Sequence, residues 1–136
     1  MSEAPIFERD FVAEPHHIDE LGHVNNSVWV QWIQDLATAH WEAAAQPEHL
    51  AAFFWVVIRH EIDYRGNIEA GETAHGATWI EGDPKGAKSL RRVEFTDDEG
   101  KRLVSAATAW AMLDRETGRL ARVREEVIAP FRAQGD

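Results

Sequence analysis

Residues 19–30, read as DELGHVNNSVWV, place an acid, a glycine, a histidine and two asparagines directly before a long amphipathic segment. From Asn26 onward, apolar residues recur at helical spacing, which predicts a helix of about 20 residues, roughly 30 Å long. A helix start offers unpaired N–H groups and the positive end of the helix dipole. The stretch therefore favours a small acyl-transfer site, in which Asp19 attacks a substrate carbonyl or directs water at it.

The rest of the chain predicts strands that pack against this helix. A first strand is expected over residues 6–14, and four consecutive strands over residues 53–64, 72–81, 88–96 and 102–114. Turn signals follow the last three of these, at residues 83–86, 97–100 and 117–118, and residues 125–131 predict a short terminal helix. One long helix on an antiparallel sheet is an α+β arrangement. Its uncovered sheet face and free edges predict an oligomer.

Composition restricts the classes of function. The 136 residues suit one domain, over residues 1–136, and the formal charge of −10 argues against nucleic acid or an anionic membrane as a partner. The absence of cysteine excludes disulfides and thiolate nucleophiles. No apolar run approaches about 18 residues, and the first residues do not read as a signal peptide, so we expect a cytoplasmic protein.

The element order and the opening stretch resemble a known family. Residues 19–26 (DELGHVNN), followed by Trp29 and Trp32, are similar to the signature of hotdog-fold thioesterases of the 4-hydroxybenzoyl-CoA thioesterase type. The chain also resembles bacterial acyl-CoA thioesterases and plant acyl-ACP thioesterases, with support from residues 114–119 and 127–131. The resemblance covers nearly the whole chain. It implies a hotdog fold, an antiparallel five-stranded sheet wrapped around one long central helix.

The resemblance also implies a function and an assembly. The enzyme would hydrolyse an acyl thioester, with Asp19 as nucleophile or general base and the backbone N–H of Asn26 polarising the thioester carbonyl. Two subunits would pair as a homodimer or as a dimer of dimers (a homotetramer), with active sites at the subunit interface. The substrate would be acyl-CoA or acyl-ACP, so coenzyme A or the carrier protein belongs to the substrate, and no other cofactor is expected.

Several residues near the acid have both a catalytic and a structural interpretation. Gly22 permits a positive φ in the loop, and Asn25 is a plausible helix N-cap beside the substrate. His23 would hydrogen-bond the substrate carbonyl or hold Asp19 in place, with a structural bond inside the loop as the alternative. Trp29 would line the acyl pocket or belong to the core.

Arg91 is the expected contact for the phosphates of coenzyme A or for an acidic carrier protein. It belongs to a basic cluster with Lys85, Lys88 and Arg92, whose alternative interpretation is a solvated hairpin. Because neighbouring residues of a strand face opposite ways, at most one of the two arginines would serve.

Three further hypotheses concern histidines and the reaction class. The pair His16 and His17 suggests a metal site with His23 and Asp19, but adjacent side chains in a strand diverge, so no metal is expected. A hydratase or dehydratase acting on acyl thioesters would need a helix base, for which His40 is the candidate. A non-catalytic acyl-thioester binding protein is the other alternative.

The chain departs from the family pattern at His17, Leu21 and Trp29. These departures leave the identity of the acyl group open.

Overall fold

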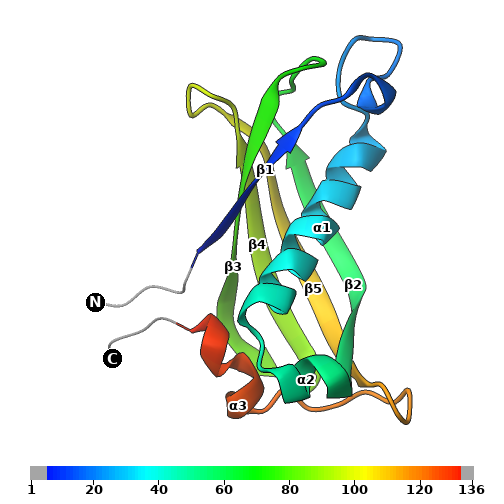
Figure 1. The fold of residues 1–136 in the computed structure, drawn as a ribbon, viewed down its shortest axis with the longest axis vertical. Coiled ribbons are helices and arrows are strands. Elements are labelled where there is room, and N and C mark those ends of the chain that lie inside the picture. Colours follow the sequence, from blue (N-terminus) through cyan, green and yellow to red (C-terminus); the bar gives the residue numbers. More distant parts are fainter. Residues whose placement is uncertain (1–5, 133–136) are drawn as a thin grey trace.

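The computed structural model describes residues 6–132, in which five strands curve around one long helix (Figure 1). In chain order the elements are β1 (Phe7–Val12), the 3-10 helix η1 (Pro15–His17), α1 (Asn26–Ala44), α2 (Pro47–Ala52), β2 (Phe53–Tyr64), β3 (Thr73–Lys85), β4 (Lys88–Thr96), β5 (Arg102–Asp114), α3 (Glu125–Ile128) and the 3-10 helix η2 (Ala129–Phe131). The strands lie in the order β1-β3-β4-β5-β2, and neighbours are antiparallel. The predicted α+β arrangement is confirmed.

Three strands have the bounds that the sequence predicted, and three other segments differ. Strand β1 is shorter than expected, since it covers Phe7–Val12 and not residues 6–14. The strand expected to end at Glu81 continues to Lys85, with a register shift against β4 that absorbs the predicted turn. The chain reverses at Gly86, whose φ is 61°. The third difference is α2, which the sequence did not predict. Pro47 was expected only to follow the long helix. It lies in the first turn of α2, where proline is tolerated.

The long helix lies in the concave face of the sheet because one of its faces is apolar. Trp29, Ile33 and Leu36 on that face have no exposed surface, and they belong to a core cluster that includes Phe95 of β4. Close approach also needs Gly76 on β3, where a Cβ atom would lie 2.8 Å from the Phe95 ring and 2.9 Å from Leu36. The core therefore fixes the depth at which α1 sits in the sheet.

The β2 edge of the sheet carries apolar side chains that are exposed in the described residues, 6–132. Strand β2 has one hydrogen-bonded neighbour, β5, and its pairing shifts register between Val57 and Arg59. Val56, Ile58 and Tyr64 on this strand are all exposed. Among the helices in residues 6–132, none has the length and apolar character needed to cross a membrane.

Candidate active site

The segment between η1 and α1 folds into a closed turn. The backbone of Asp19 donates to the carbonyl of His23 at 2.9 Å, and Gly22 donates back to the carbonyl of Asp19 at 3.0 Å. Gly22 has a φ of 81°, as the sequence predicted for this loop position. A bridge between Ile18 and Val24 closes the base of the turn. We call residues 18–25 the acid loop.

Two backbone N–H groups hold the carboxylate of Asp19. Its Oδ1 atom accepts hydrogen bonds from the N–H groups of Leu21 at 2.9 Å and His23 at 3.3 Å. Its Oδ2 atom has no hydrogen-bond partner within residues 6–132. The side chain is half-buried, so one oxygen is fixed while the other remains open to a substrate or a water molecule.

The acid loop leads directly into the N-terminus of α1. Asn25 caps the helix, as predicted, because its Oδ1 accepts from the N–H of Ser27 at 2.9 Å and from the hydroxyl of Ser27 at 2.7 Å. The N–H of Asn26, the first helical residue, has no partner within residues 6–132. An unpaired donor at the positive end of a long helix is suited to stabilising negative charge on a substrate oxygen.

Asn67, in the β2–β3 connection, holds the acid loop in place, and the sequence did not single it out. Its Oδ1 accepts from the N–H of Val24 at 3.0 Å, and its Nδ2 donates to the carbonyl of Val24 at 3.2 Å. The same Oδ1 accepts from the N–H of Ile68. No sequence signal pairs Asn67 with a residue so far away in the chain.

His23 and Trp29 lie in different environments. His23 is exposed, and its hydrogen bonds with Asp19 are made by its backbone N–H and carbonyl, so its imidazole is free to face a substrate. Trp29 is fully buried in the core, with its ring 5.1 Å from that of Trp32. Of the two interpretations for Trp29, its position in this single chain fits the core.

Arg91 lies in the interior, at the opposite end of the helix from the acid loop. From the sequence we expected Arg91 to contact phosphates, but its side chain is only 6% exposed. Its Nη1 lies 2.9 Å from Nδ1 of His40 and 3.0 Å from the hydroxyl of Thr78. A signal for this burial was present, because Arg91 has the same strand parity as the core residues Val93 and Phe95. Arg92 faces out and pairs with Glu81.

The contact with Arg91 determines the state of His40. Burial and the neighbouring guanidinium charge lower the pKa of His40 to about 4, so the ring is neutral at pH 7. Since Nδ1 accepts the hydrogen bond from Arg91, the ring proton lies on Nε2. His40 is also stacked on Phe7 at 5.0 Å. These features do not suit His40 to the role of base that a hydratase would require.

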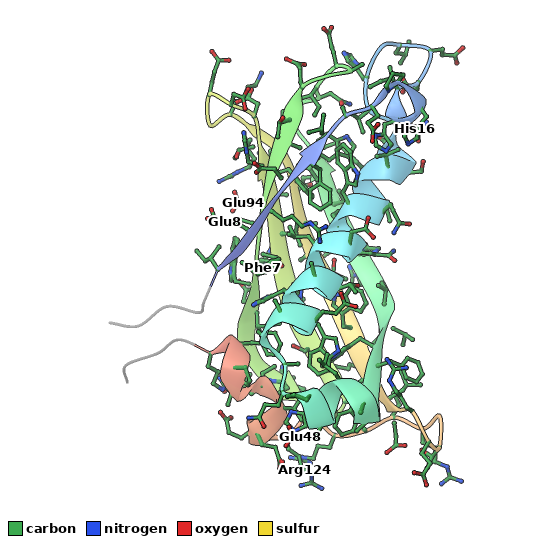
Figure 2. The ribbon with its side chains drawn as sticks, viewed as in Figure 1. Phe7, Glu8, His16, Glu48, Glu94 and Arg124 are labelled. Atoms are coloured by element: carbon green, nitrogen blue, oxygen red, sulfur yellow. The ribbon has the colours of Figure 1, made fainter. Side chains whose placement is uncertain are left out.

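The clearest cavity, of about 200 Å³, is not at the acid loop. Its lining comes from the second half of α1, the adjoining sheet and the terminal helices, and includes Arg91 but not Asp19, His23 or Asn26. Figure 2 shows the two ends of the molecule, with His16 beside the start of α1 and with Glu48 and Arg124 at the opposite end, on α2 and just before α3. The pocket expected around Asp19 is therefore not one of the well-formed cavities of the single chain.

The histidines near the acid loop do not form a metal site in the described chain. His16 and His17 contact each other, with ring centroids 4.1 Å apart, and His17 accepts a hydrogen bond from the backbone of Glu14. Within residues 6–132 no group of three or more His, Asp or Glu side chains is placed to hold a metal ion.

The fold is the hotdog fold, as comparison with solved structures shows. An acyl-ACP thioesterase from Bacteroides thetaiotaomicron matches 96% of this chain and 54% of its own, with a TM-score of 0.81 and 24% identity. A 1,4-dihydroxy-2-naphthoyl-CoA thioesterase from Synechocystis matches 90% of this chain and 92% of its own, with a TM-score of 0.73 and 13% identity. The predicted fold class is confirmed.

The chain belongs to the family described as the acyl-ACP thioesterase N-terminal domain, whose model matches residues 5–131. A chloroplastic acyl-[acyl-carrier-protein] hydrolase, FATB3 of Cuphea viscosissima, is 29% identical over 80 residues, which are 57% of this chain and 19% of that protein. The chain thus spans about a fifth of that relative and about half of the Bacteroides protein. The predicted family is confirmed.

Proposed function

We propose that this protein is an acyl thioester hydrolase and that the acid loop carries its catalytic groups. One observation carries the proposal: Asp19 has one carboxylate oxygen held by two N–H groups and the other free, in a loop that leads directly into the unpaired N–H at the start of α1. A fixed acid and a fixed donor are the two elements that attack on a carbonyl needs. Membership in the acyl-ACP thioesterase family supports the same reaction.

The free Oδ2 of Asp19 would start the reaction in one of two ways. As a nucleophile it forms a bond to the thioester carbon, the C–S bond breaks, the thiolate leaves and takes a proton, and water hydrolyses the anhydride. As a general base it takes a proton from the water that attacks. In both cases the N–H of Asn26 stabilises the oxyanion, by about 3 kcal/mol if it behaves like other single donors.

The remaining predicted residues have supporting roles in this proposal. The imidazole of His23 hydrogen-bonds the substrate carbonyl or the leaving sulfur. Gly22 lets the backbone turn close to the substrate, and Asn25 keeps the first turn of α1 in place. Whether coenzyme A or a carrier protein holds the acyl group is for the assay to decide.

We further propose that a second copy of the chain completes the cleft. The acid loop is only half covered by its own chain, and the sheet ends in a strand with exposed apolar residues. Pairing of two β2 edges would bury these side chains and would bring a second molecule to the site. The homodimer, a dimer of dimers and a cytoplasmic location stay predictions.

The decisive experiment replaces Asp19 with asparagine. Asn retains an oxygen that accepts from Leu21 and His23, so the loop keeps its shape while the negative charge is lost. We expect kcat/KM for thiol release from a panel of acyl-CoA and acyl-ACP thioesters to fall at least about 100-fold. Glu20→Gln, a neighbouring exposed acid, is the matched control and should keep wild-type rates.

Three results would reject this mechanism. Wild-type turnover in Asp19→Asn would remove the acid from the reaction. Binding of acyl-CoA without thiol release at any chain length would indicate a binding protein, and hydration of enoyl-CoA in place of thiol release would indicate a hydratase. Thermal unfolding of both variants, measured alongside, shows whether a loss of activity follows from a loss of structure.

A further inference from the structure

The cavity at the far end of α1 is mostly apolar. Its apolar walls come from α1, the sheet and the terminal helices, and include Trp41, Trp55, Ile80, Trp110, Ile128 and Phe131. The helix rise places Thr38, another lining residue, about 18 Å from Asn26 along α1. The volume of about 200 Å³ accommodates a small organic group rather than a single water molecule.

A buried positive charge lies in the wall of this cavity without a counterion. Arg91 keeps its charge at neutral pH, because burial lowers its pKa only to about 10. Its hydrogen-bond partners, His40 and Thr78, are both neutral at pH 7. Within residues 6–132 no carboxylate lies at ion-pair distance from this guanidinium. A buried charge is normally paired, so this one favours an anion from outside the described chain.

Two more donors in the same wall lack partners. The hydroxyl of Ser89 and the indole Nε1 of Trp110 are buried without a hydrogen-bond partner within residues 6–132. Ser89 and Arg91 lie two residues apart on β4, both facing inward, and Ser89 is directly opposite Trp110 on β5. The three residues that carry a guanidinium, a hydroxyl and an indole N–H therefore belong to one short stretch of the cavity lining. Such a set of donors matches a group that only accepts hydrogen bonds.

Two charged residues of opposite sign complete the lining. Glu42 on α1 is exposed. Arg115 has its guanidinium 5.5 Å from the centre of the Phe54 ring and its Nε bonded to the carbonyl of Leu50. Arg115 contacts Phe54 and Leu50 rather than Ser89 or Trp110, and Glu42 is exposed to solvent. Arg91 is therefore the charge that decides whether a bound group is an anion or a cation.

We propose that this cavity binds the carboxylate of a small organic acid. The carboxylate contacts the Arg91 guanidinium, the Ser89 hydroxyl and the Trp110 indole N–H, and the carbon chain of the acid packs against the aromatic walls. The ligand is either a free carboxylic acid or the far carboxylate of an acyl chain whose thioester end is at Asp19. Of these two ligands, only the acyl thioester depends on the proposed function.

The test compares hexanoate with hexanamide, which has the same shape and no charge. Binding is followed by titration calorimetry and by the fluorescence of the lining tryptophans. We expect hexanoate to bind at least about 10-fold more tightly than hexanamide, and Arg91→Met to remove about 10- to 100-fold of its affinity. Arg92→Met, which removes the neighbouring exposed arginine, is the matched control and should bind as the wild type does.

Ser89→Ala and Trp110→Phe keep the proposal testable if Arg91→Met fails to fold. Each removes one donor without removing the charge, and each should reduce the preference for hexanoate over hexanamide about 3- to 10-fold. Equal binding of acid and amide, binding of hexanoate weaker than about 10 mM, or equal losses in the Arg91 and Arg92 variants would overturn the site. These measurements need no turnover, so they stand even if the hydrolase proposal fails.

A kinetic comparison separates the two sources of the carboxylate. An acyl-CoA whose chain ends in a carboxylate is compared with its methyl-ended homologue. If the substrate supplies the carboxylate, the carboxylate-ended thioester has the lower KM, and Arg91→Met removes that difference. If a free acid is the ligand, the ratio of the two KM values is the same in wild type and Arg91→Met, although hexanoate binds to the wild type.

Discussion

The geometry of Asp19 and Asn26 depends on a third residue that lies outside the acid loop. The local turn fixes the carboxylate, and the cap fixes the helix start, so both could be predicted from the sequence of residues 19–27. Asn67 could not, because it reaches Val24 from the β2–β3 connection. We regard Asn67 as a positioning residue, which acts on the site through the loop backbone.

We predict that Asn67→Ala lowers both stability and rate. Val24 would lose both of its hydrogen bonds to the side chain, at a cost of about 1–3 kcal/mol in the free energy of unfolding. A looser acid loop should reduce kcat more than it raises KM for thiol release. Asn67→Asp keeps the acceptor and loses the donor, so its effect should be smaller. Equal kcat in wild type and Asn67→Ala would exclude the positioning role.

At the scale of elements, the edge strand β1 is attached by side chains as well as by its pairing with β3. His75 of β3 lies 2.7 Å from Asp10 of β1 and 2.7 Å from Asp98 in the β4–β5 turn. The hydrogen bond with Asp98, and next that with Asp10, raise the pKa of His75 above its usual 6.5. The protonated imidazole thus links three segments, although each pair is exposed and contributes little alone.

This link predicts a dependence of stability on pH. Because the pKa of His75 is higher in the folded than in the unfolded chain, its contribution is fully present below about pH 6.5 and is lost as the pH rises through the folded-state value. The difference in urea midpoint between wild type and His75→Gln should therefore be larger at pH 5.5 than at pH 8.5.

A double-mutant cycle provides the control for the His75 link. Asp98→Asn should lower the midpoint at pH 5.5 in the wild-type background and have a smaller effect in the His75→Gln background. If the His75→Gln difference were the same at both pH values, the ion pairs would not contribute to stability.

At the scale of the whole molecule, the exposed β2 edge is the surface that a second copy would cover. Ile58 is 48% exposed beside the irregularity in β2, and Val56 and Tyr64 lie on the same strand. Natural proteins seldom leave a long apolar edge strand free. Pairing at this edge would also bring in the second copy of the chain, which we propose completes the cleft. Under this proposal, assembly and activity would be linked.

We predict that Ile58→Glu separates the proposed dimer and abolishes thiol release. Each copy would place a carboxylate at the paired edges, where it is both desolvated and repelled by its counterpart. Leu120→Glu is the matched control, because Leu120 is 69% exposed and lies outside β2. Light scattering measures the mass, and the thioester assay measures the rate. A monomeric wild type, or a fully active Ile58→Glu monomer, would contradict the prediction.

The sequence by itself determined the features that depend on near neighbours. Strand-forming composition and the flanking turn signals gave β2, β4 and β5 their bounds, helical spacing gave α1, and the Asn25 cap and the Asp19 turn follow from residues within a few positions. The tertiary structure decided what depends on distant segments: the hold of Asn67 on the acid loop, the burial of Arg91 against His40, and the place of the cavity. Alternation separates the two faces of a strand, but the helix packed against the sheet decides which face is inside.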